Sequence, residues 1–535
     1  MERIKQVQPH INAMAQDCFD SALEEAAKVD ELLARFRETP GKSVNEGGDL
    51  NSESSFSSDQ LEKLNSPLLG VPVSIKESIA VKGMRHSCGV WARKDTLAQE
   101  DAVTVRNVKR LGMIPICTTN IPECTLFWAD CQNAVYGRTL NPYDLSRISG
   151  ASSGGEGSLL GSGGSLIGVG SDIGGSLRIP AHYCGVYSHK PSPFLVSAEG
   201  NFPPVKEARL RMFTIGPMCR YASDLRHLLK CLLSDKDNAK QDTYFKYQPE
   251  NIGQLRKEII DKLDEPVDLS QIKLFYFNFN SESQLKGKQS VHVQEEIMEA
   301  QQEVLDHFVS KYSCAIEHIN LDKYFKRALI TWQCMLRCGG VIDRDESYEE
   351  DELNKMFGIK SALAELIKIP LGLSKHTKES LLTIFMNSSV PRSREEAFAL
   401  CEKFEKLASE LKSEITETLG SNGVLLMPTL PTVAYKHHVA LMKTPAIRFP
   451  SLFNLLQLPV THATVRLDKK HRLPFGLSIA AKPYNDPLSI AIAEEIESAF
   501  GGWTQPTFIN AVSDNKNSIE VKESNSSSSK AVSAN

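Results

Sequence analysis

Short apolar segments alternate along the chain with segments in which apolar and polar residues repeat every three or four positions. The first pattern is typical of buried strands and the second of helices with one buried face. We expect strands within residues 67–75, 112–119, 165–173, 272–279 and 423–429, and helices within 101–111, 292–310 and 394–419. This alternation predicts an α/β fold with a largely buried sheet.

The N-terminal region, one early segment and the C-terminal end depart from this alternation. Apolar residues three or four apart over 14–38 predict an amphipathic helix that ends at the Thr-Pro-Gly sequence of 39–41. Residues 41–60 are polar and rich in turn formers, so we expect a mobile surface insertion. Residues 511–535 contain SNSSSSK and almost no large apolar side chains, so we expect a disordered tail. Residues 61–505 are then one domain, to which residues 1–40 add the N-terminal helix.

Composition and charge narrow the class of protein. The chain has 535 residues, 41% of them hydrophobic, which is enough for a large core. Its 61 Lys and Arg against 66 Asp and Glu give a net charge of −5, so we expect no nucleic-acid partner bound through broad phosphate neutralisation. No uncharged apolar run approaches the ~20 residues that a membrane span needs, so no transmembrane segment is expected in this chain.

The cysteines and histidines bear on compartment and metal binding. The 12 cysteines are dispersed without a C-x-x-C pair, and the N-terminus has no signal-peptide pattern. We therefore expect free thiols in an intracellular protein that is cytoplasmic or peripherally associated with a membrane. The 13 histidines form no HExxH or other compact ligand cluster. We expect neither a metal nor another cofactor.

Eleven of the 33 glycines lie between Gly150 and Gly175, within ISGASSGGEGSLLGSGGSLIGVGSDIGGSLRIP. Such a composition is typical of a flexible linker, but leucine, isoleucine and valine recur through it at intervals that suit buried strand and helix. Glycine also lets a backbone come close to another group, and successive amides in a turn can bind an anion. The amides of residues 173–176 would converge beside the Ser176 hydroxyl. An acyl-transfer enzyme needs such donors, because its tetrahedral intermediate carries an oxyanion.

Other glycine motifs fit this segment less well. The dinucleotide pattern G-x-G-x-x-G fails, since Gly168 and Gly170 are followed by Ile173, and no phosphate-binding lysine with Ser or Thr follows. The sequence GASSG at 150–154 matches G-x-S-x-G, the nucleophile elbow of α/β-hydrolases. That fold also needs an acid and then a histidine downstream, and the four histidines beyond residue 430 have no clear context for this role.

A lysine upstream adds a second candidate group. Lys76 directly follows an apolar run expected to be a buried strand, in GVPVSIKE. A lysine at a strand end ordinarily extends its ammonium group to solvent. A buried lysine has a lowered pKa, because burial disfavours the charged form, and can act as a general base near neutral pH.

These segments resemble the signature blocks of the amidase signature family. GVPVSIKE, GASSGGEG and GSDIGGSLRIP occur in the family's order and close to its spacing. CTTNIPECTLFW, FTIGPMCRYASDL, LLMPTLPTVA and LPFGLSIAAKPYNDPLSIAIAEEIE extend the match over residues 1–505. The resemblance implies an enzyme that hydrolyses amides. It also implies the amidase signature fold, in which a large, mixed, twisted central sheet is surrounded by helices.

The resemblance implies a role for each of several residues. Ser176 would be the nucleophile, Lys76 the general base, and Ser152, in a cis peptide bond, the bridge that carries the proton between them. This is coherent chemistry, because a serine hydroxyl is a poor nucleophile until a base takes its proton. Ser153 would be a supporting partner of Lys76.

The same resemblance implies the surroundings of the nucleophile. The backbone amides of Ile173, Gly174, Gly175 and Ser176 would form the oxyanion hole. Asp172 and Arg178 would make a supporting ion pair beneath the loop. The plain alternative for these two side chains is a pair of unrelated surface charges.

SSGGEG, VGSDIGGSLRIP and HKPSP most resemble the type 2 branch of the fatty-acid amide hydrolases. This implies hydrolysis of fatty-acid amides to the free acid and an amine through an acyl-enzyme. Residues 359–386 are apolar but punctuated by lysines, as in short helices that lie on a membrane or line an acyl channel, although core helices share this period. Members of that branch usually begin with a membrane-spanning helix, whereas Met1 here lies almost at the first family helix. The chain is thus expected to be soluble or peripheral, or to lack an anchor.

Other functions stay open beside this hypothesis. The same fold serves as the amidase subunit of tRNA-dependent amidotransferases, which releases ammonia from glutamine for a partner subunit. An amidase or esterase of other small substrates and a catalytically inactive binding protein are further alternatives, the last disfavoured by the complete catalytic set. Ala151 and Ser188 stand where the family usually has glycine, which leaves substrate preference open. Formation of a homodimer is also left open.

Overall fold

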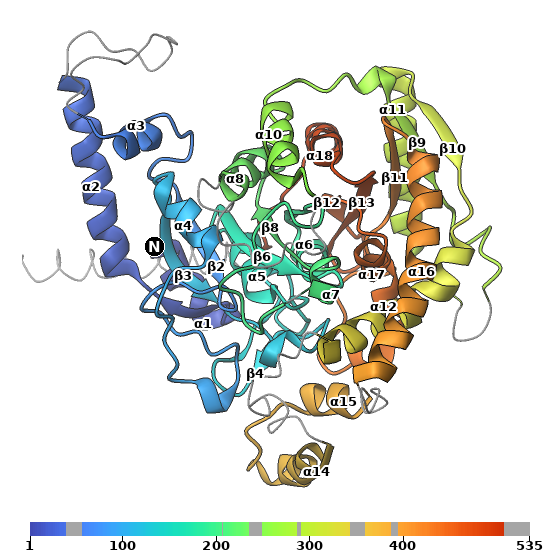
Figure 1. The fold of residues 1–535 in the computed structure, drawn as a ribbon, viewed down its shortest axis with the longest axis horizontal. Coiled ribbons are helices and arrows are strands. Elements are labelled where there is room, and N and C mark those ends of the chain that lie inside the picture. Colours follow the sequence, from blue (N-terminus) through green and yellow to red (C-terminus); the bar gives the residue numbers. More distant parts are fainter. Residues whose placement is uncertain are drawn as a thin grey trace, which may run out of the picture.

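In the part of the chain that the structure describes, a central sheet of 11 strands is surrounded by helices (Figure 1). The computed structural model describes residues 1–38, 56–205, 207–234, 249–285, 290, 292–342, 359–386 and 394–507. The strands follow one another in the order β1-β3-β2-β6-β8-β7-β12-β13-β11-β9-β10, with both parallel and antiparallel neighbours. This confirms the predicted α/β class and the mixed central sheet.

The strands of the sheet are short. They are β1 (Met14–Asp17), β2 (Pro72–Lys76), β3 (Ile114–Thr119), β6 (Ile167–Asp172), β7 (Tyr187–Lys190), β8 (Thr214–Cys219), β9 (Lys273–Tyr276), β10 (Ala315–His318), β11 (Gly423–Pro428), β12 (Val460–Leu467) and β13 (Pro474–Ala481). A separate hairpin consists of β4 (Gln132–Asn133) and β5 (Gly137–Arg138). The five predicted strands are confirmed as β2, β3, β6, β9 and β11.

The helices vary more in length. They are α1 (Glu2–Ile11), α2 (Phe19–Glu38), α3 (Ser58–Leu64), α4 (Val103–Arg110), α5 (Gly154–Gly161), α6 (Arg178–Cys184), α7 (Glu207–Leu210), α8 (Ser223–Leu233), α10 (Ile252–Lys262), α11 (Glu295–Tyr312), α12 (Asp322–Ile342), α14 (Ile359–Lys368), α15 (Lys378–Met386), α16 (Arg394–Leu419), α17 (Arg448–Leu455) and α18 (Asp486–Phe500). Short 3-10 turns include η2 (Glu123–Thr125), η5 (Ile369–Leu371) and η6 (Ala440–Ile447). The three predicted helices are confirmed as α4, α11 and α16.

The N-terminal region differs from the expected single helix over 14–38. Helix α2 begins only at Phe19, because Met14 to Asp17 form β1, which pairs antiparallel with β3 at the edge of the sheet. Residues 39–55 and 508–535 lie outside the described residues, and these ranges hold most of the expected insertion and all of the expected tail. The end of the expected insertion is packed: Phe56 is buried with its ring centroid 6.0 Å from that of Phe36, and α3 begins at Ser58.

Two neighbouring parallel strands, the third and fourth in the order of the sheet, carry candidate residues at their ends. β2 and β6 pair in parallel, with Val73 opposite Ile167 and Ile75 opposite Val169. Their apolar side chains belong to one large buried core. The carboxyl ends of the two strands therefore lie at the same edge of the sheet, where open α/β sheets generally bind their ligands. Lys76 ends β2, and Ser171 and Asp172 end β6.

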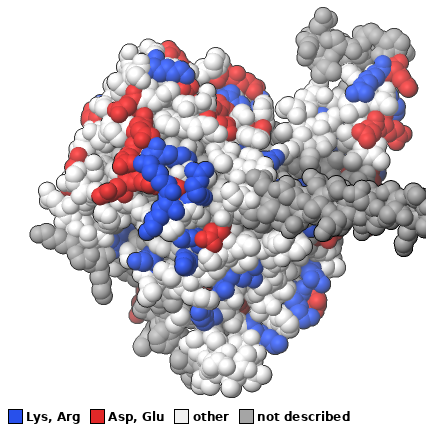
Figure 2. All heavy atoms as spheres, turned by 180° about the vertical axis from the view of Figure 1, so that it is seen from behind, with Lys and Arg blue, Asp and Glu red and all other residues white. Residues whose placement is uncertain are grey.

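The 359–386 segment projects from the body of the molecule at the bottom of Figure 1. It forms the expected pair of short helices, α14 and α15, joined through η5. None of the helices in the described part of the chain is long and apolar enough to cross a membrane. On the opposite face of the molecule, Lys and Arg side chains lie intermixed with Asp and Glu rather than forming a basic expanse (Figure 2).

Candidate active site

Lys76 is enclosed at the end of β2 and makes two short contacts. Its Nζ donates hydrogen bonds to Ser152 Oγ at 2.6 Å and to Ser171 Oγ at 2.9 Å. The side chain is fully buried, so the ammonium form loses its hydration and the pKa of Lys76 falls to about 8. A substantial fraction is therefore a neutral amine at slightly alkaline pH, and a neutral amine can accept a proton.

Ser152 sits on a glycine-rich turn directly before α5. The peptide bond between Ala151 and Ser152 is cis, as the resemblance implied. Gly150 has φ +81°, and a Cβ there would lie 2.9 Å from the backbone of Pro180, so the turn needs glycine at this position. The next amide, Ser153 N–H, donates to the carbonyl of Ser176 at 3.2 Å. This bond holds the turn of Ser152 against the turn of Ser176.

Ser171, and not Ser153, is the second partner of Lys76. The Oγ of Ser153 instead lies 3.3 Å from the carbonyl oxygen of Ser171 and 3.4 Å from its amide nitrogen. Ser153 thus reaches Lys76 only through Ser171, in the position of a supporting residue. Ser171 was missed in the sequence, because only the parallel pairing of β2 with β6 shows that its side chain lies beside Lys76.

Asp172 organises the turn that follows β6. Its carboxylate accepts hydrogen bonds from the amides of Gly175 at 2.7 Å and Leu177 at 3.1 Å. The amides of Ile173, Gly174 and Ser176 do not donate to it. The N–H of Gly175 is thus already engaged by Asp172, which is against its expected place in the oxyanion hole. Ser176, at the tip of this turn, is partly exposed while most of its neighbours are buried.

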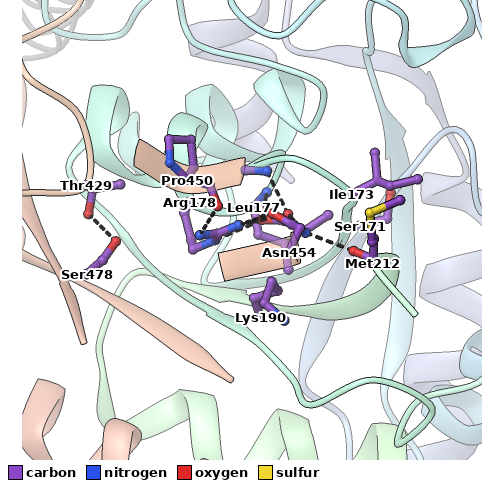
Figure 3. Close-up of polar contacts among 12 residues, drawn as sticks. Ser171, Ile173, Leu177, Arg178, Lys190, Met212, Thr429, Pro450, Asn454 and Ser478 are labelled. Atoms are coloured by element: carbon purple, nitrogen blue, oxygen red, sulfur yellow. Dashed lines mark hydrogen bonds and ion pairs between the residues drawn. The ribbon is translucent and has the colours of Figure 1, made fainter. Parts of the chain in front are cut away.

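The predicted ion pair of Asp172 and Arg178 is present, and it is buried. Arg178 Nε and Nη2 donate to the two carboxylate oxygens, both at 3.1 Å, and neither side chain is exposed. The alternative of two unrelated surface charges is wrong. Figure 3 shows Arg178 meeting Asn454 and the Pro450 carbonyl of α17, at 2.7 and 2.9 Å. Asn454 also donates to Asp172 at 2.8 Å.

The charge state of Asp172 follows from these contacts. Burial by itself raises the pKa of the carboxyl, but the charge and hydrogen bonds of Arg178 and the hydrogen bond of Asn454 outweigh it. The pKa of Asp172 falls to about 2, so the group is an anion at all physiological pH values. Its partner is fixed in place by the bidentate geometry. The turn that carries Ser176 is therefore held by a buried ion pair, Asp172 with Arg178, whose two charges neutralise each other.

A buried acid near Lys76 was not predicted from the sequence. Glu156, in α5, accepts hydrogen bonds from Ser74 Oγ at 2.7 Å and Thr119 Oγ1 at 2.8 Å. Burial raises the pKa of Glu156 to about 7, against the lowering effect of those bonds and of Lys76. When ionised, Glu156 favours the ammonium form of Lys76. The GGEG sequence shows a glutamate there, but only the fold shows that it is buried close to the lysine.

Comparison with known proteins identifies the family. A family model described as Amidase matches residues 51–489. The chain is 35% identical over 506 residues to "Fatty-acid amide hydrolase 2" of Homo sapiens, covering 95% of this chain and 86% of that protein. It is 36% identical over 510 residues to "Fatty-acid amide hydrolase 2-A" of Danio rerio, covering 95% and 85%. The chain belongs to the amidase family.

Solved structures share the fold at low sequence identity. A structure titled "Fatty acid amide hydrolase" aligns with TM-score 0.68 and 21% identity over 94% of this chain and 81% of that chain. The native peptide amidase from Stenotrophomonas maltophilia aligns with TM-score 0.67 and 18% identity over 95% and 93%. Family, relatives and fold together confirm the amidase signature resemblance. The protein is an amide-cleaving hydrolase, similar to the type 2 fatty-acid amide hydrolases.

Proposed function

We propose that the protein hydrolyses fatty-acid amides to the free fatty acid and an amine, with Lys76, Ser152 and Ser176 as its catalytic residues. The observation that carries the proposal is the 2.6 Å contact between Lys76 Nζ and Ser152 Oγ in a buried site. The turn that carries Ser152 is hydrogen-bonded to the turn that carries Ser176, because Ser153 N–H donates to the Ser176 carbonyl. The relatives named fatty-acid amide hydrolase 2, matched over 95% of this chain, support the substrate class.

In the proposed first step, Ser176 Oγ attacks the amide carbon. Its proton passes to Ser152 Oγ while the Ser152 proton passes to neutral Lys76, which becomes an ammonium. The carbonyl oxygen becomes an oxyanion and is stabilised by the amides of Ile173, Gly174 and Ser176. Such preorganised donors commonly contribute ~10²–10³-fold each to the rate.

The tetrahedral intermediate then collapses by breaking the C–N bond. The ammonium of Lys76 returns its proton through Ser152 to the leaving nitrogen, so that the amine departs neutral and the acyl group remains as an ester of Ser176. A water molecule cleaves this ester by the same proton route. The products are the fatty acid and the original Ser176 hydroxyl. One group thus serves as base and then as acid, which a pKa near the working pH favours.

We infer that the α14–η5–α15 segment contacts an anionic lipid surface from which the fatty-acid amide enters. Ile367, Leu371 and Leu373 are 72%, 67% and 63% exposed, which is unusual for large apolar side chains grouped within seven residues. Lys368 and Lys375 beside them are also exposed. Exposed apolar groups flanked by lysines are the chemistry of an interfacial helix. We therefore propose membrane contact for the exposed part of the segment, while α15 packs on the body of the molecule, with Leu381 buried.

A panel of amides with acyl chains of graded length tests the substrate class. We expect kcat/KM to rise from short to long acyl chains and glutamine to be hydrolysed poorly or not at all. Preferential turnover of glutamine would instead indicate the amidase subunit of an amidotransferase. Preferential turnover of short amides would indicate an amidase of other small substrates. Either outcome overturns the fatty-acid assignment while leaving the family intact.

A further inference from the structure

Trp332 of α12 touches the turn of Ser176 at its backbone. The indole Nε1–H donates to the carbonyl oxygen of Ile173 at 2.8 Å. The ring lies directly against the next residue, since a Cβ added at Gly174 would be 2.5 Å from Trp332 Cζ2. Trp332 itself is only 8% exposed. The contact joins two segments 159 residues apart in the sequence.

This hydrogen bond fixes the orientation of one peptide unit. The peptide between Ile173 and Gly174 is not among the cis bonds of the structure, so it is planar and trans. The C=O and N–H of a trans peptide point in opposite directions. Because the Ile173 carbonyl points to Trp332, the Gly174 N–H points to the other side of the turn, away from the indole.

The indole also disfavours the flipped arrangement. Tryptophan has a donor and no acceptor. Rotation of the peptide by half a turn would aim the Gly174 N–H at the indole N–H, two donors facing one another in a buried place, and would leave the Ile173 carbonyl without this partner. An unmade buried hydrogen bond is costly, so Trp332 selects one of the two orientations.

The rest of the turn is held by other groups. The carboxylate of Asp172 accepts hydrogen bonds from the amides of Gly175 and Leu177. The amide of Ser153 donates to the carbonyl of Ser176. None of these bonds involves the peptide between Ile173 and Gly174. Its orientation therefore depends on Trp332 in a way that the orientations of its neighbours do not.

We propose that Trp332 is a positioning residue that holds the Gly174 N–H toward the oxyanion. The inference rests on the proposed function, because it assumes that Ser176 attacks and that Gly174 belongs to the oxyanion hole. Trp332 does not touch the reacting atoms. Its effect is to keep a donor aimed where negative charge develops, which lowers the energy of the transition state more than that of the bound substrate.

The variant Trp332→Phe tests this by removing the donor while keeping an aromatic ring against Gly174. We expect kcat for a long-chain fatty-acid anilide to fall ~10–100-fold, near the lower range for loss of one oxyanion donor, with KM changed less than ~3-fold. Affinity for an acyl trifluoromethyl ketone, which forms a tetrahedral oxyanion with the nucleophile, should fall in proportion to kcat. If Trp332 served only packing or substrate binding, the variant would raise KM, and kcat and the ketone affinity would not fall in proportion.

Trp503→Phe is the matched control, because Trp503 Nε1 also donates to a backbone carbonyl, that of Gly161 at 3.0 Å, elsewhere in the fold. It should retain the kcat of the wild type. If Trp332→Phe does not fold, a benzothienylalanine at 332 keeps the shape of the indole and replaces only its N–H by sulfur, and the same loss is expected.

The outcomes separate this inference from the proposed function. Unchanged kcat and unchanged ketone affinity in a folded variant at 332 overturn the role of Trp332. A rise in KM with unchanged kcat overturns it as well. If Ser176→Ala keeps the activity of the wild type, the proposed function fails first, whatever the variants at 332 show.

Discussion

Lys76 Nζ and Ser152 Oγ lie 2.6 Å apart, although 76 positions separate the two residues in the sequence. The strand β2 delivers the lysine and the glycine-rich turn before α5 delivers the serine. Their meeting point is buried, which lowers the pKa of Lys76 to about 8. A strand-end lysine that would otherwise reach solvent thus becomes a group that exchanges protons near neutral pH.

The pH dependence of the reaction follows from this pKa. Because Lys76 must be neutral to accept a proton, kcat/KM should rise as the pH increases through about 8 and level off above it. In Lys76→Ala, kcat/KM should no longer rise with pH, and the rate above neutral pH should be ~10²–10⁴-fold lower than in the wild type. The rate of Ser152→Ala should fall by a smaller factor. A pH–rate profile measures both effects. The exposed Lys257→Ala is the control, and a Lys76→Ala profile that parallels the wild type would count against the assigned base.

Removing one member of the buried ion pair should unfold the protein more easily. Arg178→Met leaves the Asp172 carboxylate buried without its partner, so we expect the free energy of unfolding to fall by ~3–5 kcal/mol. Urea denaturation measures this loss. The matched control is Lys28→Met, which breaks an exposed pair with Glu25 and should leave the free energy of unfolding nearly unchanged. Equal effects of the two changes would show that the Asp172 pair does not support the fold.

Charge placed on the exposed apolar residues of the α14–η5–α15 segment should weaken membrane contact. We expect the double variant Leu371→Glu with Leu373→Glu to sediment less with anionic vesicles, since both changes remove apolar area and add repulsion. Hydrolysis of a short, water-soluble amide should stay unchanged, because neither residue is in the proposed site. Leu23→Glu, on α2 and 58% exposed in the wild type, is the control. Sedimentation equal to the wild type would overturn the proposed membrane contact.

A histidine couples this segment to the core in a pH-dependent way. His376 Nδ1 bonds to the buried Glu123 at 2.5 Å, and Thr377 N–H donates to the same carboxylate at 3.0 Å. The hydrogen bond and the charge of Glu123 raise the pKa of His376, with a smaller rise from Glu365, whereas burial and Lys368 act in the opposite direction. The group whose folded pKa is raised stabilises the protein fully below its unfolded pKa of ~6.5. That contribution is lost as the pH rises through the higher, folded pKa.

The free energy of unfolding, measured from pH 6 upward, tests this coupling. Relative to His376→Gln, the wild type should be more stable at pH 6, and the difference should shrink as the pH increases. The exposed His471→Gln should follow the wild type throughout. Parallel curves for the wild type and His376→Gln would contradict a stabilising charge on His376.

Some strands could be predicted from the apolar residues in their sequence, and others are recognisable only from their pairing. The four consecutive large apolar residues of 424–427 predict β11. In β8 (TIGPMC), Gly216 and Pro217 separate Ile215 from Met218, and the strand is recognisable only from its pairing with β6 and β7. The same limit applies to Met14 to Asp17. Their spacing continues that of α2, and only pairing with β3 makes them a strand.

Some residues of the site could likewise be predicted from sequence motifs, and others could not. Two contacts agree with what the resemblance implied: Lys76 bonds to Ser152, and Asp172 pairs with Arg178. The residues that the motifs do not contain depend on tertiary packing: Ser171 reaches Lys76 through strand pairing, and Trp332 reaches Ile173 from α12. Contacts of this kind leave no periodicity or spacing in the sequence. The sequence therefore did not show Ser171 as a partner of Lys76, or that the amide of Gly175 is already bonded to Asp172.

Trapping the acyl-enzyme tests the central claim most directly. Purified protein is mixed with a long-chain fatty-acid amide, quenched with acid within the first turnover, and analysed by intact and peptide mass spectrometry. We predict an added acyl group on Ser176, its appearance together with one equivalent of amine, and neither in Ser176→Ala. Amine release by Ser176→Ala at the rate of the wild type, or an acyl group on a different residue, would contradict the account.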